Sequence, residues 1–444
     1  MSRHIRNMAV IVSLLLALPA LSLAQFSSGS TGADGPYSPT VSGVFNPAAL
    51  GINPAGDNIF NFTTINIPAG VTISMPASIV RNMPVVWLAT GNVTIAGTIN
   101  LAGDPGYTVD GANSQEDVQV RREAQPGAGG YYGGLGSHGG VGPEAGAGPG
   151  GGPGGLNSST GYQCWGGTGA SYSAGLTTPY SSGTGQTYGG PYLVPLYGGS
   201  GGGGGWGSNA VNAVGGGGGA GGGAIRITST TQITLTGSIN ASGGNGGFVT
   251  NPNGSCPGGP GAGGSVNLIA PTISGNGSIY VTSGYNLSGN SSNATYTYVS
   301  NGIVRFNVTN YGFTGTILGG SFTNGVSSGD LFVGPLFNVP SNTVLAQPTL
   351  TITQVNGVNV PQPPQGLYLN PDVQINANTP VTVSIAATNV PVGTVTPILR
   401  VTSETSGDQS ITCSTLTGTL AASTGTCTAT FPFSISIAEL RVTF

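Results

Sequence analysis

One stretch of the chain restricts the possible folds more than any other: residues 198–227 read GGSGGGGGWGSNAVNAVGGGGGAGGGAIRI. Glycine gives up more conformational freedom on folding than any other residue, so a long glycine run is often a flexible linker. This run nevertheless ends abruptly in AIRI, whose alternation is typical of a strand. It is therefore a disordered linker, a phosphate-binding loop, or a segment with a defined place in the fold.

Four repeats of one pattern organise the chain around this run. They span residues 86–99, 225–239, 266–279 and 304–317, and each opens with alternating apolar residues and closes on Gly-Thr-Ile or Gly-Ser-Ile. Alternation indicates strands, and a glycine at one fixed place indicates a tight corner. The repeats predict a parallel β-helix, in which neighbouring coils bury one another's inner faces, with an antiparallel sandwich as the alternative. A preceding coil is expected at residues 60–75, with inward-facing Phe60, Phe62, Ile65, Ile67, Val71 and Ile73.

The intervals between the repeats predict where the glycine lies. The first three repeats are followed by short tails and then by glycine-rich sequence, NLAGDPG, NASGGNGG and YVTSGYNLSG. These insertions are expected to leave the β-helix at one equivalent corner and to lie on one face. The first is the largest, at about residues 103–223, so the glycine run is its closing end and AIRI is the strand that re-enters the β-helix.

Neither a nucleotide nor a metal ion suits the glycine-rich insertion. The chain has no lysine, which excludes a P-loop, and no helix follows its Gly-x-Gly-x-x-Gly strings. Calcium-binding glycine repeats need regular aspartates, whereas residues 127–223 contain 41 glycines and Glu144 as their single acid. A zinc site lacks its CxxC pairs. We expect no cofactor and no metal, although isolated ion sites stay open among Asp104, Asp110, Glu116 and Asp117.

The sequence pattern changes near residue 345. From there to residue 444, short alternating runs recur every 8–12 residues with Pro, Gly and Asn between them, which is typical of a β-sandwich. We predict a β-helix at 25–344 and an immunoglobulin-like β-sandwich at 345–444, with the boundary within 339–348.

The N-terminus and the cysteines predict an exported protein. Residues 1–24 combine Arg3 and Arg6 with a short apolar run and small residues, as a cleaved signal peptide does, and no later run would insert into a membrane. Cys413 and Cys427 lie in two Thr-rich runs joined by a turn, which predicts a cross-strand disulfide. Cys164 and Cys256 are then expected to pair across a long loop. The protein is predicted to be secreted or at the cell surface.

The charges of the chain argue against nucleic acid as a partner. Without the signal peptide there are seven Arg against thirteen acidic residues, and no basic footprint. The densest charge cluster, residues 115–125, is expected to be a solvated loop or a short helix where the insertion begins. Arg226 and Arg305 recur at matching positions, with Trp87 and Asn267 in the other repeats, and predict a stacked surface row.

No catalytic motif is visible in the sequence. His138 is the single histidine after the signal peptide and lies in a glycine-rich loop, which would not hold it rigidly enough for a catalytic triad. The acidic residues are scattered, whereas a glycosidase needs two facing carboxylates. The protein is therefore more consistent with a non-enzyme, and no catalytic residue is assigned.

Tyrosine and tryptophan side chains are spread through the insertion. Such rings combine an apolar body with a polar tip, which suits contact with sugars or with other surfaces. The alternative is that they fix the glycine-rich loops to the β-helix as a second core. The candidate ligand-binding residues are Tyr131, Tyr132, Tyr162, Trp165, Tyr188, Tyr192 and Trp206.

Together, FNFTTINIPAGVTISM, MPVVWLATGNVTIAGTINLAG, the return through GGAIRIT and the Pro- and Thr-rich C-terminal strands resemble a group of secreted, glycine-rich bacterial proteins of unassigned activity. More broadly the chain is similar to right-handed β-helix surface proteins, which include adhesins and polysaccharide lyases. The resemblance implies a fold and carries over no catalytic residue.

These observations favour an exported structural or adhesive protein that makes multivalent, low-charge contacts, with polysaccharide or other cell-surface components as partners. The all-β fold is predicted to be a right-handed parallel β-helix joined to the C-terminal sandwich. A polysaccharide lyase or glycoside hydrolase on the same scaffold is the alternative. Ice or mineral binding ranks last, because the repeats keep Thr in register in no more than one or two columns, although glycine-rich strands can also form polyproline II bundles.

Overall fold

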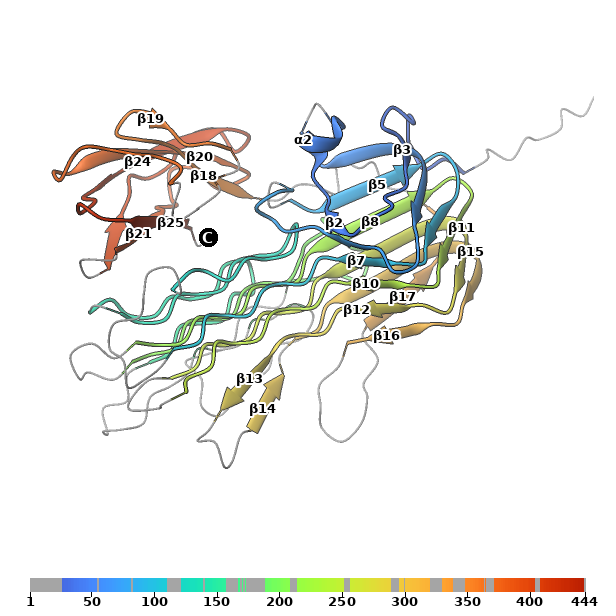
Figure 1. Cartoon of the computed structure of the whole chain (residues 1–444), viewed down its shortest axis with the longest axis horizontal. Coiled ribbons are helices and arrows are strands. Elements are labelled where there is room, and N and C mark those ends of the chain that lie inside the picture. The colour runs from blue at the N-terminus through green and yellow to red at the C-terminus, as the bar shows by residue number, and fades with distance from the viewer. Residues whose placement is uncertain are drawn as a thin grey trace, which may run out of the picture.

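A computed structural model shows an all-β protein, with long parallel sheets followed by antiparallel sheets (Figure 1). None of the described helices is long and apolar enough to cross a membrane. The predicted signal peptide, residues 1–24, lies outside the described residues. The structure describes residues 26–53, 56–80, 83–109, 121–138, 140–156, 167, 170, 172, 188–207, 214–250, 256–288, 295–298, 300–319, 330–337, 348–362, 364, 371–403 and 408–442.

The larger parallel sheet has nine strands, ordered β17-β15-β11-β8-β5-β3-β6-β9 with β1 paired to β3. The longer strands β3 and β11 each pair with two successive strands of a neighbouring repeat, β3 with β5 and β6, and β11 with β8 and β9. The strands are β1 (Gly35–Tyr37), β3 (Ile59–Ile67), β5 (Val85–Ala89), β6 (Val93–Ile95), β8 (Ala224–Ser229), β9 (Gln232–Leu235), β11 (Ser265–Gly275), β15 (Ile303–Phe313) and β17 (Asp330–Gly334).

The second parallel sheet has six short strands, ordered β16-β12-β10-β7-β4-β2. Its register aligns one isoleucine from each of five strands, and these side chains contribute to the main core or pack against it. The row is Ile73, Ile99, Ile239, Ile279 and Ile317. The predicted alignment of the four repeats on Gly-[Thr/Ser]-Ile is therefore confirmed. The strands are β2 (Gly43–Val44), β4 (Thr72–Ser74), β7 (Thr98–Asn100), β10 (Ser238–Asn240), β12 (Ser278–Tyr280) and β16 (Thr316–Leu318).

The start of the first repeat differs by one residue from its predicted position. Val85, not Val86, pairs with Ile225, and Ile225 is in register with Val266 of β11. The first two repeats therefore both carry one residue more than the later two. That residue falls where the chain turns between β5 and β6 and between β8 and β9, whereas β11 and β15 continue without a break.

The core lies between the two parallel sheets and is rich in aromatic side chains at its N-terminal end. Trp87 is fully buried and makes edge contacts with Tyr37, Phe45 and Phe62 at centroid distances of 5.4, 5.2 and 5.8 Å. The residues predicted to face inward from the preceding coil are all buried in this core, which confirms that prediction: Phe60, Phe62, Ile65, Ile67, Val71 and Ile73.

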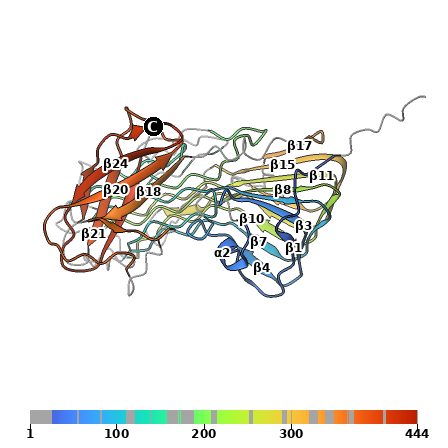
Figure 2. The same cartoon turned by 90° about the horizontal axis from the view of Figure 1, so that it is seen from above.

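The C-terminal strands form two antiparallel sheets with a hydrophobic core of their own (Figure 2). The sheets have the orders β19-β18-β20-β24-β23 and β22-β21-β25. The predicted boundary at 339–348 falls almost wholly outside the described residues. The strands are β18 (Thr349–Val355), β19 (Val358–Asn359), β20 (Val381–Thr388), β21 (Ile398–Ser403), β22 (Gln409–Thr412), β23 (Thr417–Gly418), β24 (Ser423–Ala429) and β25 (Ser436–Arg441).

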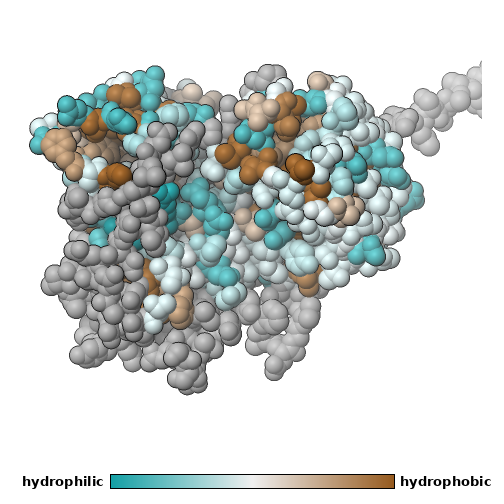
Figure 3. Space-filling view, in the orientation of Figure 1, coloured by the Kyte–Doolittle hydropathy of each residue, from teal (hydrophilic) through white to brown (hydrophobic). Residues whose placement is uncertain are grey.

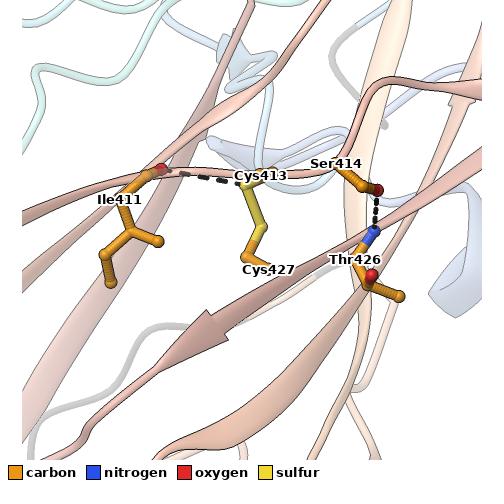
Figure 4. The surroundings of a disulfide bond; sticks show 5 residues. All are labelled: Ile411, Cys413, Ser414, Thr426 and Cys427. Atoms are coloured by element: carbon orange, nitrogen blue, oxygen red, sulfur yellow. Dashed lines mark hydrogen bonds between the residues drawn. A yellow bond between two sulfur atoms is a disulfide. The ribbon is translucent and has the colours of Figure 1, made fainter.

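The predicted disulfide between Cys413 and Cys427 is confirmed (Figure 4). It joins the residue after β22 to β24 and so connects the two antiparallel sheets. Beside it, the N–H of Thr426 donates to Oγ of Ser414 at 2.9 Å. A disulfide indicates an oxidising environment. Cys164 lies outside the described residues, so its pairing with Cys256 stays a prediction.

The glycine-rich segments leave the parallel sheets at one equivalent corner, as predicted. The segments after β7, β10 and β12 run side by side toward the antiparallel sheets (Figure 1). Neighbouring segments are hydrogen bonded from their first residues, Leu101 N–H to Asn240 at 2.6 Å and Ala241 N–H to Tyr280 at 2.7 Å. After β12 the chain also forms a hairpin of β13 (Tyr285–Ser288) and β14 (Thr295–Tyr298).

Hydrogen bonds in the glycine run have a period of three residues. Gly199 and Gly202 donate to the carbonyl oxygens of Gly222 and Gly219 at 2.7 and 2.9 Å, and Gly205 continues the series to Gly216. Gly201 and Gly204 instead donate to a different neighbouring segment, at Ala147 and Glu144. A period of three without bonds inside the segment is that of a polyproline II helix. The polyproline II bundle comprises residues 101–106, 131–136, 144–147, 151–155, 198–206, 215–223, 241–247 and 256–264, with a turn joining 144–147 to 151–155.

Close packing explains why this bundle needs glycine. A Cβ on Gly201, Gly202 or Gly203 would overlap the backbone carbonyl oxygen of Tyr132, Gly259 or Pro153, each in a different segment. The φ angles of these three glycines are not positive, so the absent side chain, and not a left-handed conformation, is what the position requires. Residues 198–205 are all buried. The described part of the run is therefore neither a linker nor a phosphate loop, but a packed element of the fold.

Candidate functional site

A buried carboxylate joins the glycine-rich insertion to the antiparallel sheets. Asp408 precedes β22, and its side chain is 0% exposed. Arg400 of β21 donates to it from Nη2 at 2.7 Å, and Arg121 donates from Nη1 at 3.1 and 3.2 Å. Nδ1 of His138 lies 3.3 Å from Oδ1. Burial alone would raise the pKa of Asp408, but the His138 hydrogen bond and the two arginine charges lower it well below its usual range.

A second ionic group lies beside the first. Arg441 of β25 contacts the carboxylate of Glu123, and its Nε lies 3.0 Å from Glu144. Arg400 Nη1 lies 3.4 Å from the other oxygen of Glu144, and Glu439 accepts the N–H of Glu123 at 3.2 Å. The carboxylates of Glu123, Glu144 and Glu439 approach within 4.8 Å of one another, as the ligands of a cation would. The guanidinium groups of Arg441 and Arg400 already supply positive charge there.

The two ionic groups together form the junction, which consists of Arg121, Glu123, His138, Glu144, Arg400, Asp408, Glu439 and Arg441. The first four residues belong to the insertion at 103–223 and the last four to the antiparallel sheets, so the contacts bridge distant parts of the chain.

The expectation that the charge cluster at 115–125 is a solvated loop is wrong for the residues that the structure describes. Arg121 is 2% exposed, and the side chain of Glu123 is 10% exposed. The physical reason is that each meets an opposite charge from the C-terminal sheets, which compensates for its desolvation. Asp110, Glu116 and Asp117 lie outside the described residues, and Asp104 is exposed.

The stability of the junction is expected to depend on pH. Burial and neighbouring carboxylates raise the pKa of Glu439, and burial raises that of Glu123, although Arg441 opposes both shifts. The folded state therefore holds these protons more tightly, and stability falls as pH rises from the unfolded value near 4.5 toward the folded pKa. The lowered pKa of Asp408 acts oppositely, because its stabilisation is lost as pH falls below about 4.

Chemical denaturation between pH 3 and 9 is expected to show a stability maximum near pH 4–5 and a decline from there toward alkaline pH. Glu439→Gln, which imitates the protonated side chain, is expected to reduce the decline toward alkaline pH. A stability that rises steadily from pH 5 to 8 in the wild type would contradict this assignment.

A second polar surface covers the outward side of the six-stranded sheet. The side chains before the buried isoleucines align in register and form the hydroxyl row, which is Thr72, Thr98, Ser238, Ser278 and Thr316. Two residues further along each strand lies the second row, which is Ser74, Asn100, Asn240, Tyr280 and Leu318. Strand geometry places neighbours within a row about 4.8 Å apart and the two rows about 6.6 Å apart. Neither row contains a charged residue.

Hydrogen bonds within this surface link adjacent strands. Oγ1 of Thr98 lies 3.0 Å from Oγ of Ser238. Beyond the strands, Thr282 donates to Ser242 at 2.9 Å, so the polar surface continues onto the polyproline II bundle. The prediction that Thr keeps register in at most one or two columns agrees with the hydroxyl row, which mixes Thr with Ser. The signal in the sequence was the Thr or Ser that stands before isoleucine in every repeat.

Some of the candidate aromatic side chains are packed inside the protein, and others are partly or largely exposed. Tyr188 donates to Gly198 at 2.6 Å and packs edge-on against buried Tyr172 at 4.7 Å, in a small hydrophobic core separate from the main one. Tyr131, Tyr132 and Trp206 are half-buried, and Tyr162 and Trp165 lie outside the described residues.

Tyr192 is the most exposed of the described candidates, at 64%. Its ring lies 5.0 Å from the guanidinium carbon of Arg305, which also donates to Pro191 at 2.8 Å. Tyr192 therefore remains a candidate for contact with a ligand.

Arg226, Asn267 and Arg305 do form the predicted row, in register across β8, β11 and β15. The row is buried and not on the surface, with exposures of 1%, 3% and 5%. In the first repeat this position is taken by Val86, which pairs with Arg226, and not by Trp87 as predicted. The one-residue shift of the first repeat places Trp87 in the core.

No known protein family, curated protein or solved structure matches this chain.

Proposed function

We propose that this chain is an exported structural or adhesive protein that makes multivalent contacts with a neutral polysaccharide at the cell surface. In this proposal the two parallel sheets belong to one right-handed parallel β-helix, the hand that crossovers between parallel strands almost always take. The polyproline II bundle is an extension of its coils. The antiparallel sheets form an immunoglobulin-like sandwich held to the bundle by the junction.

The distribution of charge carries the proposal. None of the six arginines in the described part of the chain is exposed. Among the acidic residues whose side chains are described, Asp57 and Asp104 are the exposed ones. The described part of the surface therefore offers little electrostatic attraction to nucleic acid or charged lipid. It offers hydroxyl and amide groups, which suit a partner that is itself neutral and rich in hydroxyls.

The enzymatic alternative receives less support from the described carboxylates. A glycosidase needs two carboxyl groups that face a sugar in an open groove. Glu123, Glu144 and Glu439 instead meet Arg400 and Arg441 where the bundle contacts the C-terminal sheets. The disulfide and the predicted signal peptide support export.

Co-sedimentation with insoluble neutral polysaccharides tests the proposal. The full chain is expected to bind at least one of them and to keep its affinity within about twofold between 0.05 and 1 M NaCl, because no charge pairs are screened. DNA and an anionic polysaccharide serve as controls and are expected to stay unbound. Absence of binding to every neutral polysaccharide, or loss of binding in high salt, would overturn the proposal, and release of soluble sugar would favour the enzyme.

A further inference from the structure

We infer that the outward face of the six-stranded sheet is the binding site, and that its ligand is an ordered neutral polysaccharide whose hydroxyl groups repeat across a flat array. This inference rests on the proposed function and assigns it to one surface. The surface consists of the hydroxyl row and the second row, continued by Ser242 and Thr282.

The regularity of the surface is fixed from the inside. Each outward residue of the hydroxyl row is followed by an isoleucine in the buried row, of which Ile99, Ile239 and Ile279 are 0% exposed. A shift of one residue would expose the isoleucines and bury the hydroxyls, so the core locks the register. The outward groups therefore repeat at the strand spacing of about 4.8 Å and form an array that is rigid before any ligand binds.

The two asparagines of the second row keep hydrogen-bond donors for a ligand. Oδ1 of Asn100 accepts the N–H of Ala102, and Oδ1 of Asn240 accepts that of Ser242, both at 3.1 Å. The acceptor of each amide is thus used within the chain, and its NH2 group remains as a donor. The hydroxyls of the first row act as donors and acceptors. Donors and acceptors side by side match the hydroxyls of a sugar, which also act as both.

The composition of the rows favours a polysaccharide over ice or a mineral. Ser238 and Ser278 interrupt the threonines of the hydroxyl row, so methyl groups do not repeat on every strand. The half-buried ring of Tyr280 lies beside Asn240 in the second row, where it offers an apolar surface to the face of a sugar ring. A mineral would require charged side chains, which both rows lack. In the space-filling view the surface over β7, β10 and β12 is mostly pale or hydrophilic (Figure 3).

Substitution of one central residue tests the assignment. Ser278→Arg places a long charged side chain in the middle of the hydroxyl row and is expected to weaken co-sedimentation with the bound polysaccharide at least tenfold. Ser274→Arg is the matched control, because Ser274 is also half-buried but lies in the nine-stranded sheet. It is expected to bind within twofold of the wild type. Should Ser278→Arg fail to fold, Thr98→Val combined with Ser238→Ala removes two adjacent hydroxyls with little change in volume.

The possible outcomes separate the surface from the function. Loss of binding in the hydroxyl-row variants with retention in Ser274→Arg and Tyr192→Ala would support the inference. Retained binding in the hydroxyl-row variants with loss in Tyr192→Ala would overturn it while the proposed function stands. Wild-type protein that binds no neutral polysaccharide would defeat the proposed function itself. Thermal hysteresis that Ser278→Arg abolishes, without polysaccharide binding, would overturn the ligand class.

Discussion

Gly202→Ala is expected to destabilise the protein by about 3 kcal/mol, the upper part of the usual range for overpacking. The new Cβ would overlap the carbonyl group of Gly259, which is backbone and cannot rotate away as a side chain could. Gly202 also donates to Gly219 at 2.9 Å and accepts from Gly134 at 2.7 Å, so any displacement would disturb two further segments. Chemical denaturation of the purified variant measures the loss.

Gly190→Ala provides the matched control within the same insertion. Gly190 is exposed, nothing lies within 4 Å of a Cβ built on it, and its φ is not positive. The substitution is expected to change stability by no more than about 0.5 kcal/mol. Similar effects of the two substitutions would show that the glycine run is not close-packed. Limited proteolysis adds a second measurement, since only Gly202→Ala is expected to open residues 198–223 to broad-specificity proteases.

The parallel sheets were largely predictable because their signal is carried by side chains. Alternation placed Ile65, Ile67 and Ile73 in the core, and the Gly-[Thr/Ser]-Ile pattern fixed the register of the smaller sheet. The error at Val86 arose where two adjacent valines fit the alternation equally well. The pairing of Val85 with Ile225 in the neighbouring repeat, which a single sequence does not reveal, decides between them.

The glycine bundle and the junction were predicted less well, for two different reasons. Glycine has no side chain, so the run contains no pattern from which its three-residue hydrogen-bond period could be read. The junction could not be predicted for the opposite reason. Its side chains are distinctive but lie far apart in the sequence, as Arg121 and Asp408 do, at a separation of 287 residues. The few charges of this chain appeared as scattered surface groups until the fold brought them together.

Asp408→Asn is expected to cost 3–5 kcal/mol of stability, the usual penalty for breaking a buried ion pair from one side. It would leave Arg121 and Arg400, whose side chains are 3% and 1% exposed, without the carboxylate between them. Glu144 remains 3.4 Å from Arg400, but Arg441 already shares that carboxylate. Because asparagine has nearly the same shape, the loss would reflect charge and hydrogen bonding, and not an empty cavity. Chemical denaturation at pH 7 measures it.

Asp57→Asn is the control, because it removes one negative charge from an exposed side chain outside the ion pairs of the junction and is expected to change stability by less than about 0.5 kcal/mol. If Asp408→Asn stayed within 1 kcal/mol of this control, the junction would not be what holds the C-terminal sheets to the bundle. The expected result has a functional consequence. Arg121, Arg400 and Arg441 are largely buried in the junction, so the charges that hold the C-terminal sheets in place do not contribute to the surface that is proposed to meet the ligand.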